Sequence, residues 1–113
     1  MRTQVARALG AYPHPASLPA LERLVADLAW QVRAQAVRAL GMLSDRKTLA
    51  LVRAAASDPE WWVRFRAGLA LTRFGSDGMR VLVDADVGPD PRARDMAHLI
   101  LGLSSQALAE FSG

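Results

Sequence analysis

One ten-residue pattern occurs four times along the 113-residue chain and constrains the fold more than any other feature. The four copies occupy residues 1–10, 32–41, 63–72 and 93–102, so their starts are almost evenly spaced. A unit this short cannot bury its apolar face alone and must stack on neighbouring copies. The repeat therefore predicts a solenoid, in which each unit contacts the units before and after it.

Within each copy, apolar and small residues recur at intervals of three and four, as they do on one face of an α-helix. In the second copy these residues are Val32, Ala36, Ala39 and Leu40. A second apolar segment follows each copy after a break. The expected second helices span residues 18–28, 48–56 and 79–85, with a short final one over 105–111. The predicted fold is all-α: a right-handed α-solenoid of antiparallel helical hairpins with three and a half repeats and a period of roughly 30–31 residues.

Three residue types mark the expected helix ends. Gly41 and Gly102 stand where first helices are expected to end, a position that favours the left-handed conformation. Pro59 and Pro91 fit the first turn of the helix that follows, where a missing N–H costs nothing. The candidate N-caps of the second helices are Ser17, Asp45, and Ser76 or Asp77.

A further motif stands at the junctions between repeats. Residues 58–64 read Asp-Pro-Glu-Trp-Trp-Val-Arg and precede the A-x-x-A-L spacing of the third copy. Residues 27–33 follow the same pattern without the proline, whereas the last junction has Gly88 in place of the aspartate and Ala93 in place of the valine. This pattern is similar to the HEAT-like repeats first described in phycocyanobilin lyases, and the similarity covers essentially the whole chain. The resemblance implies the stacked-hairpin fold but not a function, because such repeats serve many purposes.

The resemblance also bears on the extent of the protein. Bacterial HEAT-like proteins that this chain resembles continue upstream with more repeats, and some carry an N-terminal membrane anchor. The first copy here begins in mid-pattern at Met1. We therefore expect residues 1–113 to form a single domain that is the C-terminal part of a longer cytoplasmic repeat protein, with or without a membrane tether upstream. Self-association through the uncapped N-terminal helix is a further expectation, because Val5, Ala8 and Leu9 repeat core positions with no unit before them.

The composition argues against several classes of function. The chain has no cysteine, so it has neither disulfides nor thiolate ligands. No apolar run approaches the roughly 18–20 residues that a membrane-spanning helix needs, so we expect no membrane insertion by this segment. His14 and His98 have no histidine or glutamate at metal-ligand spacing, and the sequence contains no nucleophile motif or phosphate-binding loop. We expect no catalytic activity, no cofactor and no metal.

Charge favours a protein partner over nucleic acid. Fourteen basic and eleven acidic residues are interspersed along the chain, and the net charge is +3. Nucleic-acid-binding domains usually gather basic residues on one face. The first hypothesis is a protein-interaction module. A nucleic-acid-binding domain resembling the HEAT-like DNA glycosylases, which use an aspartate beside tryptophans, is an alternative because Asp58 precedes Trp61 and Trp62. An accessory subunit resembling the bilin lyases is another.

Arginines and aspartates recur at fixed positions of the repeat. The arginines are Arg2, Arg33, Arg64 and Arg94, and the aspartates are Asp27 and Asp58. Equivalent residues lie in line in a solenoid, so these side chains are expected to form a structural ladder. We expect each aspartate to cap the following helix and to accept hydrogen bonds from arginines of adjacent repeats. An anion-binding row of arginines is the alternative.

The third repeat alone carries an apolar stripe beside its core stripe. The stripe consists of Trp62, Phe65 and Leu69, at positions i, i+3 and i+7 of one helix. Together with Arg66 these residues form the candidate partner-binding surface, because aromatic and arginine side chains are enriched in binding hot spots. Packing between repeats is the alternative interpretation and would bury the stripe. Trp30 and Trp61 are equivalent residues and are expected to cover the turns between repeats.

Overall fold

The computed structural model describes residues 14–103 together with residues 106 and 110. The elements are the 3₁₀-helix η1 (Pro15–Ser17), α2 (Leu18–Leu24), α3 (Trp30–Leu43), the 3₁₀-helix η2 (Arg46–Thr48), α4 (Leu49–Ala55), α5 (Trp61–Thr72), α6 (Gly75–Asp86) and α7 (Pro91–Leu101). This part of the chain contains no β-strand, and the all-α prediction is confirmed. The helix expected at the N-terminus, with its role in self-association, and most of the final helix expected over 105–111 lie outside the described residues.

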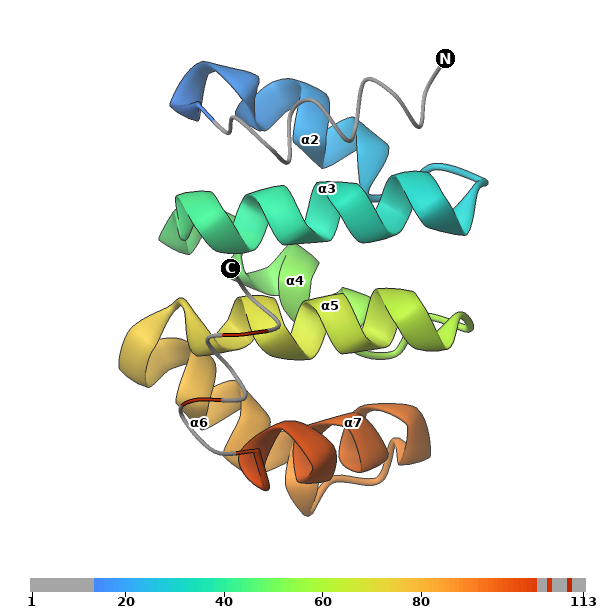
Figure 1. Cartoon of the computed structure of the whole chain (residues 1–113), viewed down its shortest axis with the longest axis vertical. Helices are drawn as coiled ribbons and strands as arrows, with labels where there is room; N and C mark the ends of the chain where they lie inside the picture. Colours follow the sequence, from blue (N-terminus) through green and yellow to red (C-terminus); the bar gives the residue numbers. More distant parts are fainter. Residues whose placement is uncertain (1–13, 104–105, 107–109, 111–113) are drawn as a thin grey trace.

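The helices form two layers (Figure 1). Helices α3, α5 and α7 stack in one layer, and α4 and α6 lie behind them. Helix α3 packs on α5, α5 packs on α7, and α5 also contacts α4 and α6. The pairs α3–α4 and α5–α6 are helical hairpins, so the architecture is the α-solenoid that the repeat predicts.

The hydrophobic core follows the repeat positions of the first helices. Three pairs of equivalent residues in α3 and α5 are at most 1% exposed: Val32 and Val63, Ala36 and Ala67, and Leu40 and Leu71. Full burial of one leucine or valine side chain contributes about 1.5–3 kcal/mol to stability. The core therefore lies where helices of one repeat meet those of the next, and a single hairpin would leave it open to water.

Gly41 permits the close contact between α3 and α5. A Cβ atom at this position would lie 2.6 Å from the Cβ atom of Ala70 and 2.8 Å from its Cα atom. The prediction that Gly41 ends its helix is wrong, because α3 continues to Leu43 and ends at Ser44, which has a φ of 47°. Gly102 follows α7 in the right-handed conformation, with a φ of −82°. At Gly41 the absence of a side chain, rather than backbone freedom, is what the structure uses.

The connection between α5 and α6 departs from the one between α3 and α4. Gly75, the equivalent of Ser44, also has a positive φ, 64°. Helix α6 starts directly at this residue, whereas the 3₁₀-helix η2 precedes α4. A Cβ atom at Gly78 would lie 1.8 Å from the carbonyl oxygen of Leu71, so only glycine lets the first turn of α6 lie against the end of α5.

The early start of α6 also changes which of its residues are buried. Leu21 in α2 and Val52 in α4 occupy equivalent positions of the repeat and are fully buried. The equivalent residue in α6, Val83, is 51% exposed, and the preceding Leu82 is buried instead. The second helices therefore do not share one register, and α6 turns a different face toward α5 and α7.

Helix capping agrees with the sequence signals at some ends only. Asp45 accepts a hydrogen bond from the backbone N–H of Lys47 at 2.9 Å, as the N-cap of η2. Pro91 is the first residue of α7, whereas Pro59 lies two residues before α5 begins. Ser17 occupies the N-cap position of α2 without a side-chain hydrogen bond. The other two candidate caps, Ser76 and Asp77, lie inside the first turn of α6.

We predict that Gly41→Ala lowers the free energy of unfolding by about 1–3 kcal/mol, because overpacking against Ala70 outweighs the roughly 1 kcal/mol by which a helix favours alanine over glycine. Gly102→Ala is the matched control. A Cβ atom there would meet no atom closer than 3.4 Å, so stability should be unchanged or slightly higher. Urea unfolding followed by circular dichroism measures both variants. A Gly41→Ala variant as stable as the parent would show that α3 and α5 are further apart than described.

Candidate functional site

Arg33 and Asp58 join two successive repeats. Nε of Arg33 donates to Oδ2 of Asp58 at 2.8 Å, and Nη2 donates to Oδ1 at 3.1 Å, so the contact is bidentate. Nη1 of Arg33 donates to the backbone carbonyl oxygens of Asp27 at 2.8 Å and Leu28 at 3.0 Å. The hydrogen bond to Asp58 raises the pKa of Arg33 above its ordinary value, although burial opposes the shift. The guanidinium thus ties the turn before α3 to the turn before α5.

Arg64 occupies the same place one repeat later but makes a simpler set of contacts. Its Nη1 donates to the carbonyl oxygens of Asp58 at 2.8 Å and Pro59 at 3.1 Å. Within the described part of the chain it contacts no carboxylate, since Gly88 stands where the pattern would place an aspartate. The Arg33–Asp58 contact is therefore not repeated at the next junction.

The junction aspartates close turns in the backbone. Oδ1 accepts a hydrogen bond from the N–H two residues later, at 2.8, 2.9 and 3.0 Å, in the pairs Asp27–Ala29, Asp58–Glu60 and Asp90–Arg92. Only Asp90 is itself an N-cap, that of α7. The N-caps of α3 and α5 are Ala29 and Glu60, so the expectation that Asp27 and Asp58 cap these helices is wrong by two residues. Both aspartates stabilise the turn that precedes the helix.

The contacts of Asp58 bear on the alternative of a DNA-glycosylase-like site. Both carboxylate oxygens accept hydrogen bonds from Arg33, and one also accepts from the backbone of Glu60. The side chain of Asp58 is only 10% exposed. A catalytic aspartate must reach a water molecule or the substrate. The geometry around Asp58 gives that alternative no support.

No three histidine, aspartate or glutamate side chains of residues 14–103, 106 and 110 gather closely enough to hold a metal ion. Over the same residues, every helix is too short or too polar to cross a membrane.

Trp61 and Trp62 begin α5 and form a cluster with Phe65. The rings of Trp61 and Phe65 stack, with centroids 5.0 Å apart and planes at 10°. Trp62 meets Trp61 edge-on, with centroids 4.9 Å apart and planes at 87°. Trp61 is 41% exposed and Trp62 is 51% exposed, whereas Phe65 is 7% exposed. The cluster therefore presents two half-exposed indole rings on a buried phenylalanine.

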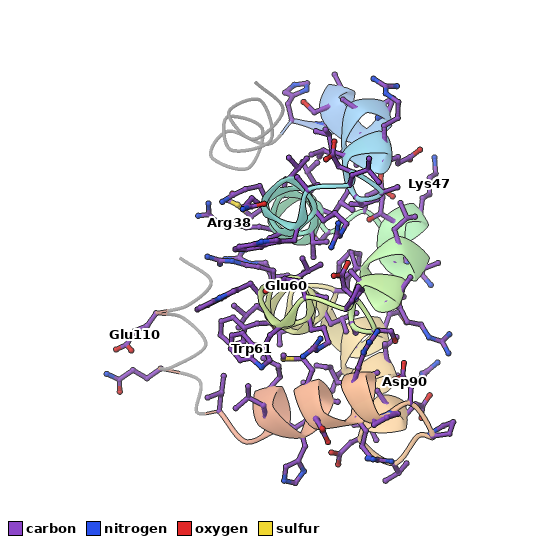
Figure 2. All side chains as sticks on the ribbon, turned by 90° about the vertical axis from the view of Figure 1, so that its right-hand side faces the viewer. Arg38, Lys47, Glu60, Trp61, Asp90 and Glu110 are labelled. Carbon is purple, nitrogen blue, oxygen red and sulfur yellow. The ribbon has the colours of Figure 1, made fainter. Side chains whose placement is uncertain are left out.

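The cluster lies on the outer face of the layer that contains α3 and α5. Figure 2 shows Arg38 and Trp61 on this side of the molecule, and Lys47 and Asp90 on the side of α4 and α6. Trp30, the equivalent of Trp61, is partly buried against the core. The two tryptophans that the repeat makes equivalent thus differ in exposure.

The stripe that the sequence predicts as one exposed surface is exposed at one end only. Trp62 is half exposed, but Phe65 and Leu69 are 7% and 3% exposed. The stripe turns toward α3 along the length of α5, and Leu69 lines the narrow space between the two helices with Arg38 and Met42. The continuous patch of Trp62, Phe65 and Leu69 is thus corrected to a surface of Trp61 and Trp62. The sequence signal for Trp61 was its place next to Trp62, outside the core positions.

Arg66 adds positive charge to this face. It lines the same narrow space between α3 and α5 as Arg38 and Arg73. Burial lowers the pKa of Arg66 below its ordinary value, and the positive charge of Arg38 lowers it further. We call Trp61, Trp62 and Arg66 the aromatic surface.

We predict that Arg33→Met lowers the free energy of unfolding by about 1.5–3 kcal/mol, because Asp58 would lose its charged partner while staying mostly buried. Arg64→Met, at the equivalent position, removes the same two bonds to carbonyl oxygens but no carboxylate contact. It should cost about 1 kcal/mol or less. Chemical denaturation of both variants measures the difference. Equal losses would mean that the bidentate contact contributes nothing.

Two protein-family models match the chain. One, described as HEAT repeats, matches residues 21–102, which contain helices α3 to α7. The other, described as PBS lyase HEAT-like repeat, matches residues 1–27. No curated protein matches the chain. The first match covers most of the sequence and coincides with the stacked hairpins of the structure. The chain therefore belongs to the HEAT-repeat family.

Proposed function

We propose that the chain is a non-catalytic protein-interaction module whose partner binds the aromatic surface. The observation that carries this proposal is the pair of adjacent indole rings, 41% and 51% exposed, at the start of α5. Membership of the HEAT-repeat family supports it, because HEAT repeats generally act as scaffolds for protein interactions.

The chemistry of the aromatic surface suits a binding hot spot. Tryptophan and arginine are the side chains most enriched among residues that dominate binding energy. Trp61 stacks on the buried ring of Phe65, and Trp62 packs edge-on against Trp61. Rings held in this way lose little further conformational freedom when a partner binds, so more of the contact energy remains as affinity. A rigid apolar platform is thus already present in the free chain.

Charge indicates the kind of partner. Arg66 lies with Arg38 and Arg73 along the space between α3 and α5, so three guanidinium groups gather on this face. Guanidinium groups bind carboxylates through charge-assisted hydrogen bonds, and complementary charge across an interface favours specific association. We therefore propose a protein partner that places an apolar group on the tryptophans and an acidic side chain beside Arg66.

The two alternatives have less support. The carboxylate of Asp58 is bound by Arg33, which disfavours a glycosylase-like role. The PBS lyase HEAT-like match covers residues 1–27 and shares no residue with the aromatic surface. Arginine beside tryptophan also binds single-stranded nucleic acid by stacking, so the experiment must separate that outcome from protein binding.

We predict that Trp62→Ala weakens binding of the partner by about 2 kcal/mol, roughly thirtyfold in Kd. The free energy of unfolding should fall by about 1 kcal/mol or less, since half of the ring faces solvent. Leu28→Ala is the control, because Leu28 is 96% exposed and lies outside the aromatic surface. Partners are recovered by cross-linking from extracts of the source cells, and the affinity of each purified partner is then measured by calorimetry.

Phe65→Ala is the comparison variant whose main effect should be on stability rather than on binding. This side chain is buried beneath the tryptophans, so its loss should cost about 3–5 kcal/mol of stability, as core phenylalanine deletions do. A partner whose affinity is unchanged by both Trp62→Ala and Arg66→Ser would contradict the proposal. So would the recovery of nucleic acid instead of protein, with an affinity that falls steeply as salt rises.

A further inference from the structure

A pocket of about 480 Å³ lies on the other side of the molecule, where α4, α5, α6 and α7 meet. Its apolar lining comes from all four helices and includes Leu49, Leu71, Val81, Leu82, Met96 and Ala97. Small-molecule sites in proteins typically have volumes of roughly 300–1,000 Å³ and are lined mainly by apolar side chains. The pocket therefore has the size and the interior of a ligand site.

The departure of α6 from the repeat accounts for the position of this pocket. Gly75 and Gly78 let α6 start directly at the end of α5. The resulting register turns Val81 and Ala85 toward the pocket, while Val83 faces solvent. Arg80, which also lines the pocket, stands where α4 has the apolar Leu49. The register of α6 thus determines which of its residues line the pocket.

Two arginines line the pocket from different helices. Arg53 belongs to α4 and Arg80 belongs to α6, and both side chains are exposed. Among the described residues neither guanidinium makes a hydrogen bond or an ion pair. Guanidinium groups bind carboxylates through paired, charge-assisted hydrogen bonds. The pocket is thus lined by two cations, on separate helices, that have no carboxylate partner among the described residues.

Three aspartates also line the pocket, and one of them is paired with a cation. Oδ2 of Asp77 lies 3.1 Å from Nε of Arg46. Asp90 accepts a hydrogen bond from the hydroxyl of Ser57, which lowers the pKa of Asp90 below its ordinary value and keeps it ionised, so its negative charge remains in the lining. Asp84 has no such partner in the part of the chain that the structure describes. Besides Asp77, which is paired with Arg46, the lining carries two guanidinium groups and the carboxylates of Asp84 and Asp90, so the carboxylate of a ligand must lie closer to the arginines than to these two aspartates.

The backbone of the walls restricts what can enter the pocket. Apart from Ser57 and residues 88–90, nearly all wall residues belong to helices, whose N–H and C=O groups are mostly bonded within each helix. A polar group of a ligand buried among Leu71, Leu82 and Met96 would lose its water without gaining a partner, which is costly. The inner part of a ligand must therefore be apolar, and its polar group must stay near the arginines.

We propose that this pocket binds a small amphipathic carboxylate, with its apolar body against Leu71, Leu82 and Met96 and its carboxylate between Arg53 and Arg80. The site is separate from the aromatic surface, so it does not depend on the proposed protein interaction. Asp84 limits the affinity, because it places a like charge near the bound carboxylate.

The test uses decanoate as the probe, added to the full 113-residue chain labelled with ¹⁵N, below the concentration at which decanoate self-associates. Titration should shift the amide resonances of residues that line the pocket and should give a saturable Kd. Arg53→Gln and Arg80→Gln should each raise this Kd about two- to fivefold, the range for exposed ion pairs. Asp84→Asn should lower it by up to about fivefold, because it removes the like charge.

Three controls make the result specific. Decanol, which has no charge, should bind with an affinity that none of these three substitutions changes. Ala85→Phe, which fills the pocket from α6, should abolish binding of both probes while the thermal unfolding midpoint is retained. Trp62→Ala should leave decanoate binding unchanged, which separates this site from the aromatic surface.

Four results would overturn the proposal. The first is a decanoate Kd that is indifferent to the arginine substitutions and to Asp84→Asn. The second is equal affinity for decanoate and decanol. The third is a set of shifts confined to residues outside the pocket. The fourth is tighter binding by a capped peptide of two leucines and a glutamate, which would assign the same chemistry to a segment of a partner protein.

Discussion

The close contact of α3 with α5 is the constraint on which the rest of the structure depends. Gly41 meets Ala70 at a distance that leaves no room for a side chain, so the two helices lie near enough to bury the repeated valines, alanines and leucines between them. Arg33 and Asp58 then join the turns that precede these helices. Because α5 is held against α3 along its length, its first turn presents Trp61 and Trp62 outward, and its last turn determines where α6 can begin.

Both candidate sites lie where the third repeat departs from its neighbours. Trp62 takes the place of Gln31 in the second repeat, and Arg80 takes the place of Leu49. Gly78 replaces Lys47 and brings α6 against the backbone of Leu71. A residue type that recurs at the same position in every repeat is explained by the stacking of repeats. Stacking does not explain an exposed residue that differs from its equivalents in the other repeats. The regular positions thus build the scaffold, and the irregular ones carry the proposed interactions.

The fold could be predicted from the sequence because Leu40 and Leu71 occupy equivalent positions and the same period governs both helices. The sites could be predicted only in part. The burial of Phe65 and Leu69 depends on how far α3 reaches over α5, which the pattern within one helix does not contain. The role of Gly41 was missed for a similar reason, since a glycine near a helix end and a glycine at a helix crossing look alike in sequence. The pocket depends on the register of α6. The nearly constant period of the repeat predicts the same register for every second helix, so the shift in α6 could not be predicted from the sequence.

The most direct test of the central claim is a nuclear Overhauser measurement across the contact between α3 and α5. In the stacked solenoid, the methyl group of Ala70 lies against the α-hydrogens of Gly41, so a methyl-detected spectrum should show a strong cross-peak between them. The δ1 methyl group of Ile100 should give the corresponding cross-peak with Gly68, at the contact between α5 and α7. A spectrum in which Ala70 shows cross-peaks only to residues of its own hairpin would contradict the stacking of α3 on α5, and with it the placement of both candidate sites.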